Sequence, residues 1–244
     1  ALTIRKFAES MITMEELVQR KSLTEECKED LCALTECGYN IFISGATSTG
    51  KTTFLNVLAD YIPKTERVIT IEDSAELQLH DIANLVRMEV RQADAEGVSS
   101  VTLRDLIKAS LRMRPDRIIV GEVRGPEALD MIQSMNTGHD GSLSTGHANS
   151  PEDMLSRIET MILMGSDMPL PAIRKQIASS IDIIIQLGRL RDRSRRVTEI
   201  TEVLSCDQNG YVLNKLFQFN ERDDLLRETS VYGNAPEKVR GGLD

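Results

Sequence analysis

The sequence predicts an α/β protein with a mostly parallel central sheet and helices on both faces. From residue 40 onward, short apolar runs alternate with segments of helical spacing. A glycine-bounded loop at residues 45–52 joins one apolar run to a helix, and acidic residues follow two of the later runs. Parallel strands need crossover connections, which helices supply, and the strands between them are buried on both faces.

Each expected element rests on a local pattern. Residues 2–7 alternate like a strand, and two short helices at 14–20 and 24–36 each follow a Thr or Ser that can cap them. Apolar runs predict strands at 40–44, 67–72, 85–90, 118–120, 141–148, 182–187, 197–204 and 211–219. Helical spacing predicts helices at 52–58, 101–113, 126–135, 151–164 and 171–180.

Composition narrows the class of protein. The 244 residues suit one large domain, or one domain with a small appendage, and 41% apolar residues are enough for a core. The net charge of −9 argues against a general nucleic-acid binder, so no nucleic-acid partner is expected. The chain has no apolar run of about 18 residues and opens with no signal peptide, which predicts a soluble, cytoplasmic protein.

The four cysteines are expected to be reduced thiols. Cys27, Cys32 and Cys37 are spaced five apart, unlike the C-x-x-C pairs of zinc sites, and Cys206 is remote from them. Metal binding by these residues is the weaker alternative.

The loop at residues 45–52 has the composition of a phosphate-binding loop. Its backbone N–H groups and the N-terminus of the following helix would face the phosphates of ATP. Lys51 would reach the β- and γ-phosphates, and the hydroxyl of Thr52 would bind Mg²⁺. The residues expected to contact nucleotide are Gly45, Ala46, Thr47, Ser48, Thr49, Gly50, Lys51, Thr52 and Thr53.

Polar residues with catalytic potential follow three apolar strands. Glu122 ends the strand at 118–120 as a Walker B acid does, and Glu72, Asp73 and Glu76 cluster after the strand at 67–72. His147 ends a third strand, between Thr145 and Asn149. The carboxyl ends of parallel strands meet at one edge of a sheet, so these groups are expected near the phosphate loop.

Four ordered motifs resemble those of the type II/type IV secretion ATPase superfamily. They are the phosphate loop, the Glu-Asp-x-x-Glu box at 72–76, the Leu-Arg-Met-Arg-Pro-Asp-Arg-Ile-Ile-Val-Gly-Glu-Val-Arg run at 111–124, and Thr-Gly-His…His-Ala-Asn between residues 137 and 149. Within this superfamily, residues 136–142 and 194–200 are similar to the Flp/Tad pilus ATPase branch. The resemblance spans roughly residues 1–220.

The resemblance implies a RecA-like ATPase domain in a homohexameric ring. The ring would lie on the cytoplasmic face of the inner membrane, contact a platform protein there, and couple ATP hydrolysis to pilus assembly or protein secretion. In this interpretation, residues 1–12 are the remnant of an N-terminal domain, 13–220 form the ATPase domain and 221–244 are a charged tail. Arg5 matches the region where family members place γ-phosphate-contacting arginines.

The resemblance also implies individual roles. Glu76 matches the glutamate that polarises water, with Glu122 as its rival, and His147 matches a histidine that senses the γ-phosphate. Thr52 and Glu122, with Glu72 and Asp73, are the expected Mg²⁺ ligands.

Two departures from the family pattern bear on these roles. Ala46, Ser48 and Thr49 replace Gly, Gly and Ser of the usual loop, and a side chain at a position of positive φ adds strain of roughly 1 kcal/mol. Gly146 replaces the usual apolar residue before the box histidine. We expect nucleotide binding to persist and hydrolysis to be slow.

Alternative functions remain open from sequence alone. The protein could be a nucleotide-gated scaffold with little turnover, or a nucleic-acid translocase, although the acidic balance disfavours the latter. The basic run at 188–196 is interpreted as a solvated turn, with docking to an acidic partner or to anionic lipid as the alternative.

Overall fold

The computed structural model describes residues 12–93 and 99–233, and within them nine strands form one sheet in the order β3-β2-β4-β5-β1-β6-β7-β8-β9. The strands from β3 to β6 in this order are parallel, and β7, β8 and β9 continue the sheet antiparallel. Their bounds are β1 Ile41–Gly45, β2 Arg67–Glu72, β3 Asn84–Glu89, β4 Arg117–Val120, β5 Leu143–Gly146, β6 Ile183–Arg189, β7 Arg195–Asp207, β8 Gly210–Asn220 and β9 Leu225–Glu228. The predicted mixed α/β fold with a mostly parallel sheet is confirmed.

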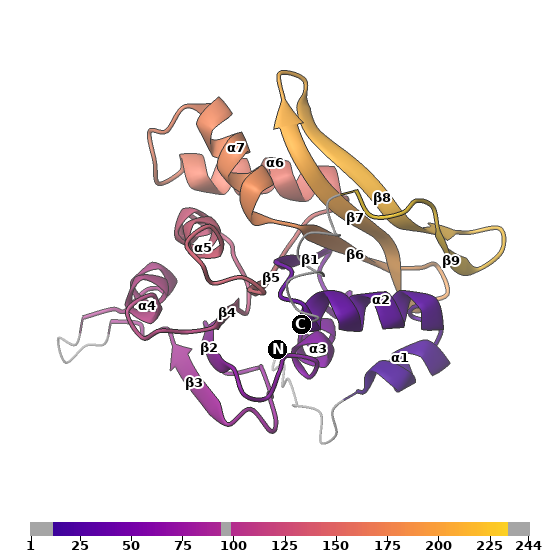
Figure 1. Ribbon diagram of the computed structural model, residues 1–244, viewed down its shortest axis with the longest axis horizontal. Helices are drawn as coiled ribbons and strands as arrows, with labels where there is room; N and C mark the ends of the chain where they lie inside the picture. The colour runs from indigo at the N-terminus through magenta and orange to yellow at the C-terminus, as the bar shows by residue number, and fades with distance from the viewer. Residues whose placement is uncertain (1–11, 94–98, 234–244) are drawn as a thin grey trace, which may run out of the picture.

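Helices cover both faces of the parallel part, as Figure 1 shows. One face carries α1 (Met14–Gln19), α2 (Glu25–Glu36) and α3 (Lys51–Ala59), and the other carries α4 (Leu103–Ser110), α5 (Glu127–Met135), α6 (Pro151–Leu163) and α7 (Leu170–Ser180). Strand β1 shows why two apolar layers form. Ile41 and Ile43 pack with α1–α3, whereas Phe42 between them packs on the opposite side, because successive strand side chains point to opposite faces.

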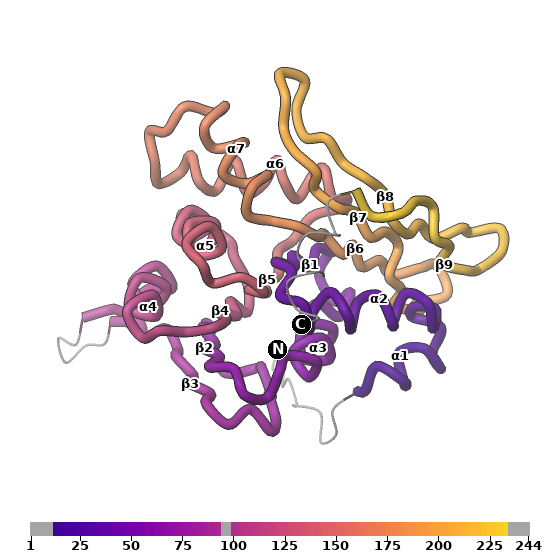
Figure 2. The backbone as a smooth tube through the Cα atoms, in the orientation of Figure 1, coloured from indigo at the N-terminus to yellow at the C-terminus, as the bar shows by residue number. Residues whose placement is uncertain are grey.

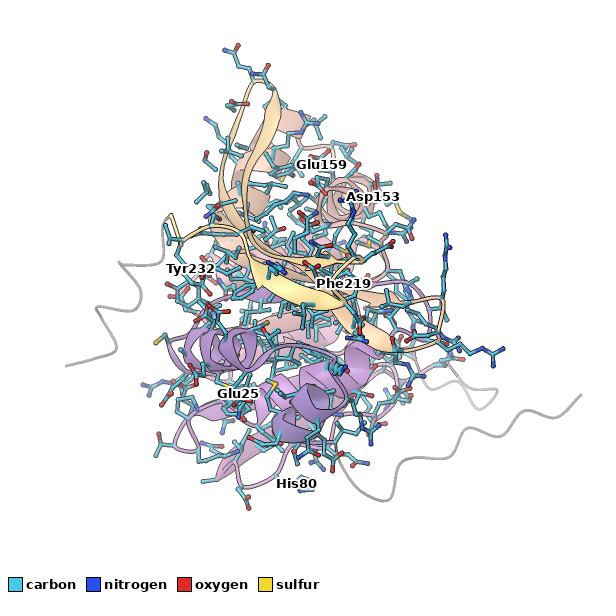
Figure 3. All side chains as sticks on the ribbon, turned by 90° about the vertical axis from the view of Figure 1, so that its right-hand side faces the viewer. Glu25, His80, Asp153, Glu159, Phe219 and Tyr232 are labelled. Carbon is cyan, nitrogen blue, oxygen red and sulfur yellow. The ribbon has the colours of Figure 1, made fainter. Side chains whose placement is uncertain are left out.

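The antiparallel strands extend the sheet past the helices. The tube in Figure 2 shows β7 and β8 as a long ribbon that projects beyond the parallel layers. Near its base, Tyr232 (labelled in Figure 3) donates a hydrogen bond to Asp30 on α2 at 2.9 Å. The chain that follows the ribbon is therefore fastened to a helix of the parallel part.

Most predicted elements are confirmed, with differences at their ends. The helix predicted at 101–113 ends at Ser110, and the strands predicted at 197–204 and 211–219 are longer than the sequence indicated. Residues 225–228, predicted to lie in a charged tail, instead form β9 and pair with β8. The strand expected at residues 2–7, with Arg5, lies outside the described residues.

Two further expectations concern helices and thiols. Among the helices that the structure describes, none is long and apolar enough to cross a membrane. All four cysteines are free thiols. Cys27, on α2, is buried in the apolar layer between the sheet and helices α1–α3.

Candidate functional site

The phosphate loop, residues 45–52, leaves the carboxyl end of β1 and runs into α3. Gly45 is tightly enclosed, since a Cβ there would lie 2.6 Å from Thr49 Oγ1 and 2.7 Å from the Leu187 carbonyl oxygen. Gly50 adopts a left-handed φ of 97° just before the helix. No side chain of the described residues caps α3, so the N–H groups of its first turn face outward and favour an anion.

The departures from the usual glycine pattern have one visible consequence. Ser48 has a φ of 65°, in the left-handed region that favours glycine, so the expected strain is present at this position. Thr49 is buried and donates from Oγ1 to the Ala46 carbonyl at 2.9 Å, which closes the loop on itself. The hydroxyl of Thr49, at the position where the family pattern has Ser, thus helps to hold the turn of the loop.

Lys51 lies folded against the loop. Its Nζ donates to the carbonyls of Gly45 at 3.0 Å and Ala46 at 3.2 Å, and lies 3.1 Å from His147 Nδ1. Burial lowers the pKa of Lys51, and the Glu122 carboxylate acts in the opposite direction. The cation is therefore held beside the loop at low exposure.

A chain of charged and polar groups continues from Lys51 to the strand ends. His147 Nε2 lies 2.7 Å from Glu122 Oε1, and Arg124 contacts the other oxygen of Glu122 at 2.6 Å and Asp73 at 3.5 Å. Because an ammonium has only donors, Nδ1 of His147 accepts from Lys51, and the ring proton sits on Nε2, toward Glu122. Burial, followed by the charge of Lys51, lowers the pKa of His147.

The acidic box contains two different carboxylates. Glu72 is buried, and its Oε1 accepts hydrogen bonds from the backbone N–H groups of Glu76 and Leu77, both at 2.9 Å. Burial raises the pKa of Glu72. These two hydrogen bonds fix the turn that presents Glu76, whereas the sequence had suggested Glu72 as a metal ligand.

Most of the phosphate loop and several of the strand-end groups line one cavity of about 770 Å³, although Glu72 and Asp73 are not among its lining residues. The loop residues from Thr47 to Phe54 meet Glu76, Glu122, Arg124 and His147 there, as the sequence predicted for the strand ends. The cavity also has an apolar wall, which includes Ile12, Leu17, Leu187 and Val197.

The cavity fits a nucleotide with a bound cation. Thr52 and Glu122 both line it, and their oxygens suit Mg²⁺. Throughout residues 12–93 and 99–233, no three acidic, histidine or cysteine side chains are grouped to hold a metal ion. This agrees with the way Mg²⁺ is usually held beside phosphates, through one or two protein oxygens together with phosphate oxygens and waters.

The second glycine-containing motif lies at the opposite edge of the sheet. We name residues 137–142 the amino-edge loop, because they precede β5. His139 Nδ1 lies 3.2 Å from the Ser134 carbonyl, and Ser142 Oγ accepts from the N–H of Ile118. Of the two stretches that resembled the Flp/Tad branch, residues 136–142 do not line the cavity, whereas residues 194–197 of the other stretch do. His80 (Figure 3) is exposed elsewhere.

The amino-edge loop surrounds a buried arginine. Arg117 bonds to the Thr35 and Glu36 carbonyls at the end of α2, and pairs with Glu66. A Cβ at Gly141 would lie 2.7 Å from its guanidinium. The glycine is thus explained by packing against Arg117.

Packing likewise explains Gly146, the unusual residue before His147. A Cβ at this position would lie 2.8 Å from Met154 and 2.9 Å from Phe42.

Sequence reasoning missed one contact of the phosphate loop, a hydrogen bond from Arg195 Nε to the Ser48 carbonyl at 3.0 Å. The basic run was the available signal, but the two residues are 147 positions apart.

The parallel sheet, the loop between β1 and α3, and the acids at the strand ends define the P-loop class of protein. The sequence model of a family described as "Type II/IV secretion system protein" matches residues 1–229. The chain therefore belongs to this family, and the resemblance inferred from its motifs is confirmed at that level.

Relatives in sequence agree with this membership. A putative conjugal transfer protein of Mycobacterium tuberculosis is 39% identical over 158 residues, 65% of this chain and 44% of that protein. The type IV secretion system protein VirB11 of Bartonella henselae is 41% identical over 171 residues, 68% of this chain and 46% of that protein. The chain thus spans less than half the length of these two relatives.

Solved structures share the fold. The VirB11 ATPase of the Brucella suis type IV secretion system, in complex with sulphate, is 30% identical with a TM-score of 0.64, covering 80% of this chain and 64% of its own. The pilus retraction motor PilT with bound ADP has a TM-score of 0.60 at 22% identity, covering 93% of this chain and 56% of its own, and shows the fold alone.

Proposed function

We propose that this chain is the RecA-like ATPase domain of a secretion or pilus-assembly machine. It hydrolyses ATP with Mg²⁺ as cofactor. The observation that carries the proposal is the meeting of Lys51, Glu76, Glu122 and His147 at the phosphate loop in one cavity. Family membership supports it, and so does the Brucella suis relative, which is an ATPase by name and was solved with sulphate, a tetrahedral anion like phosphate.

The chemistry begins with a rearrangement of Lys51. The phosphates of ATP would draw its ammonium from the carbonyls of Gly45 and Ala46, because a charged acceptor forms the stronger hydrogen bond. The same movement would remove the cation from His147 Nδ1 and leave Nε2 of the imidazole beside Glu122 Oε1. Through His147, the binding of phosphate at Lys51 would thereby affect the acidic residue Glu122 at the end of its strand.

We assign Glu76 as the group that accepts the proton of the attacking water. Glu76 and Glu122 both line the cavity, and Glu76 is the one that the motif resemblance matches to the water-polarising glutamate. Glu72 fixes the turn that presents Glu76. Bound Mg²⁺ would contribute positive charge against the phosphates, with Thr52 and Glu122 as its nearest protein oxygens. Arg124 would balance the acids at the two strand ends.

The test is steady-state phosphate release with Mg-ATP, measured beside ATP affinity. Glu76→Gln should bind ATP like the unmodified chain and lose about 10²–10⁴-fold in turnover, the usual contribution of a general base. Glu122→Gln, the matched carboxylate, should weaken Mg²⁺-dependent binding as well. Near-normal turnover in Glu76→Gln would rule out its assignment.

The assembly is also a proposal. We infer a homo-oligomer, as a ring of six, on the cytoplasmic face of the inner membrane, with a platform protein of the Flp/Tad type as partner. The motif resemblance supports this inference. Turnover per chain that rises with protein concentration would support shared sites between copies, and turnover independent of concentration would count against them.

A nucleotide-gated scaffold is the second candidate, and the strained Ser48 favours it. A loop held in a strained shape would bind nucleotide while positioning the phosphates poorly for hydrolysis. In the same assay, this candidate predicts saturable ATP binding with no phosphate release above the Glu76→Gln level.

A further inference from the structure

The turn between β6 and β7 overhangs the phosphate loop. Strand β6 lies directly beside β1, with Leu187 opposite Gly45, so the chain that leaves β6 passes the start of the loop. The turn then folds back with Arg189 opposite Arg195, and residues 193–197 line the same cavity as the loop. This segment is therefore the part of the antiparallel ribbon that lies nearest the proposed phosphate site.

The turn is firmly anchored. Asp192 Oδ1 accepts from the backbone N–H and from the hydroxyl of Ser194, at 2.8 and 2.7 Å. Arg196 donates to the Lys21 carbonyl at 2.8 Å, pairs with Asp224 at 3.1 Å, and stacks over Phe219 (Figure 3) at 5.6 Å. The basic run is thus a largely exposed turn, as the sequence predicted, and the buried Arg196 ties it to the α1–α2 connection.

Arg195 projects from this anchored base across the phosphate loop. Its Nε donates to the Ser48 carbonyl at 3.0 Å, and its Cδ lies 3.4 Å from where a Cβ on Gly50 would be. The carbonyl that it holds belongs to the residue with the strained φ of 65°. A hydrogen bond to that peptide opposes the relaxation that a serine in this conformation favours.

We propose that Arg195 is a positioning residue that clamps the phosphate loop in its binding shape. The clamp explains how the loop tolerates Ser48 where the family pattern has glycine. The inference deepens the proposed function and rests on it, because the clamp matters only if the loop binds phosphates. It also gives one residue of the basic run a role within this chain.

Arg195 could instead touch the phosphates directly, and a double-mutant cycle separates the two roles. Glycine at position 48 adopts a positive φ without strain, so a clamp on that peptide loses its purpose in a Ser48→Gly chain. If the guanidinium instead contacts a phosphate directly, changing Arg195 should reduce nucleotide affinity by the same factor with Ser or Gly at position 48.

The experiment measures binding of a fluorescent ADP analogue with Mg²⁺ to the full chain. Arg195→Gln should weaken affinity about tenfold, which is the loss of one hydrogen bond to a charged donor. In the Ser48→Gly background the same change should cost about twofold or less. Arg195→Lys, which keeps a charged donor, should recover most of the affinity.

Two controls complete the design. Arg191→Gln changes a neighbouring arginine of the same turn that does not line the cavity, and should leave affinity unchanged. Lys51→Ala reports on the site itself, and unaltered binding in that variant would overturn the proposed function. Normal affinity in Arg195→Gln, or an equal loss in both backgrounds, would overturn the clamp while leaving the proposed function intact.

Discussion

The phosphate loop and the amino-edge loop are alike in sequence and opposite in use. Both loops are short and contain two glycines, and each carries a residue of a type that often acts in binding or catalysis, Lys51 in one and His139 in the other. The phosphate loop opens onto a cavity beside an uncapped helix N-terminus. The amino-edge loop instead packs around the buried Arg117.

The difference lies in which edge of the sheet each loop occupies. At the carboxyl edge, β1, β2, β4 and β5 deliver polar side chains toward a helix N-terminus. At the amino edge, Arg117 satisfies the last carbonyls of α2, so positive charge serves the end of a helix. The position of each loop, at the carboxyl or the amino edge of the parallel sheet, therefore decides whether its polar residues lie at the cavity.

The sharpest test of this comparison changes Lys51. Lys51→Ala should reduce ATP affinity by about a hundredfold, because it removes charged hydrogen bonds to the phosphates worth about 3 kcal/mol. Isothermal titration with Mg-ATP measures the loss, and circular dichroism checks that the fold is retained. An affinity within threefold of the unmodified chain would place the phosphates elsewhere.

A smaller effect of a different kind is expected at the other loop. Gly141→Ala should lower the free energy of unfolding by about 2 kcal/mol, since it forces a left-handed alanine against the Arg117 guanidinium. Denaturant titration measures the change. ATP affinity of the folded variant should be unaltered, and a selective loss of affinity with normal stability would contradict the structural role.

The smallest effect is expected at His139. His139→Ala should change ATP affinity and maximal turnover by less than about twofold, because the imidazole lies against Ser134 and Thr137 and does not line the cavity. The matched change His147→Ala should reduce turnover strongly, since His147 lies between Lys51 and Glu122. Similar losses in both variants would break the comparison between the two edges.

The sequence was most informative where local patterns decide structure. Strands such as residues 67–72 and the caps at Thr13 and Thr24 follow from apolar runs and from side chains that accept nearby N–H groups. The convergence of loop and strand ends follows from parallel topology, which the alternation of strands and helices already implied.

What sequence could not supply depends on contacts between distant positions. Strand β9 forms because Leu226 is buried against the core and its neighbours pair with β8, although the segment itself is charged. Glu72 looked like a metal ligand beside Asp73, but burial turns it toward the backbone of its own turn. The clamp by Arg195 joins residues far apart in the chain, and no local pattern signals it.

Hydrogen–deuterium exchange across the whole chain, with and without Mg-ADP, tests the central claim most directly. We predict that nucleotide slows exchange in residues 45–54 and at the ends of β2 and β4, and leaves residues 137–142 unchanged. Protection of the amino-edge loop, with none at the phosphate loop, would contradict the assignment of the site.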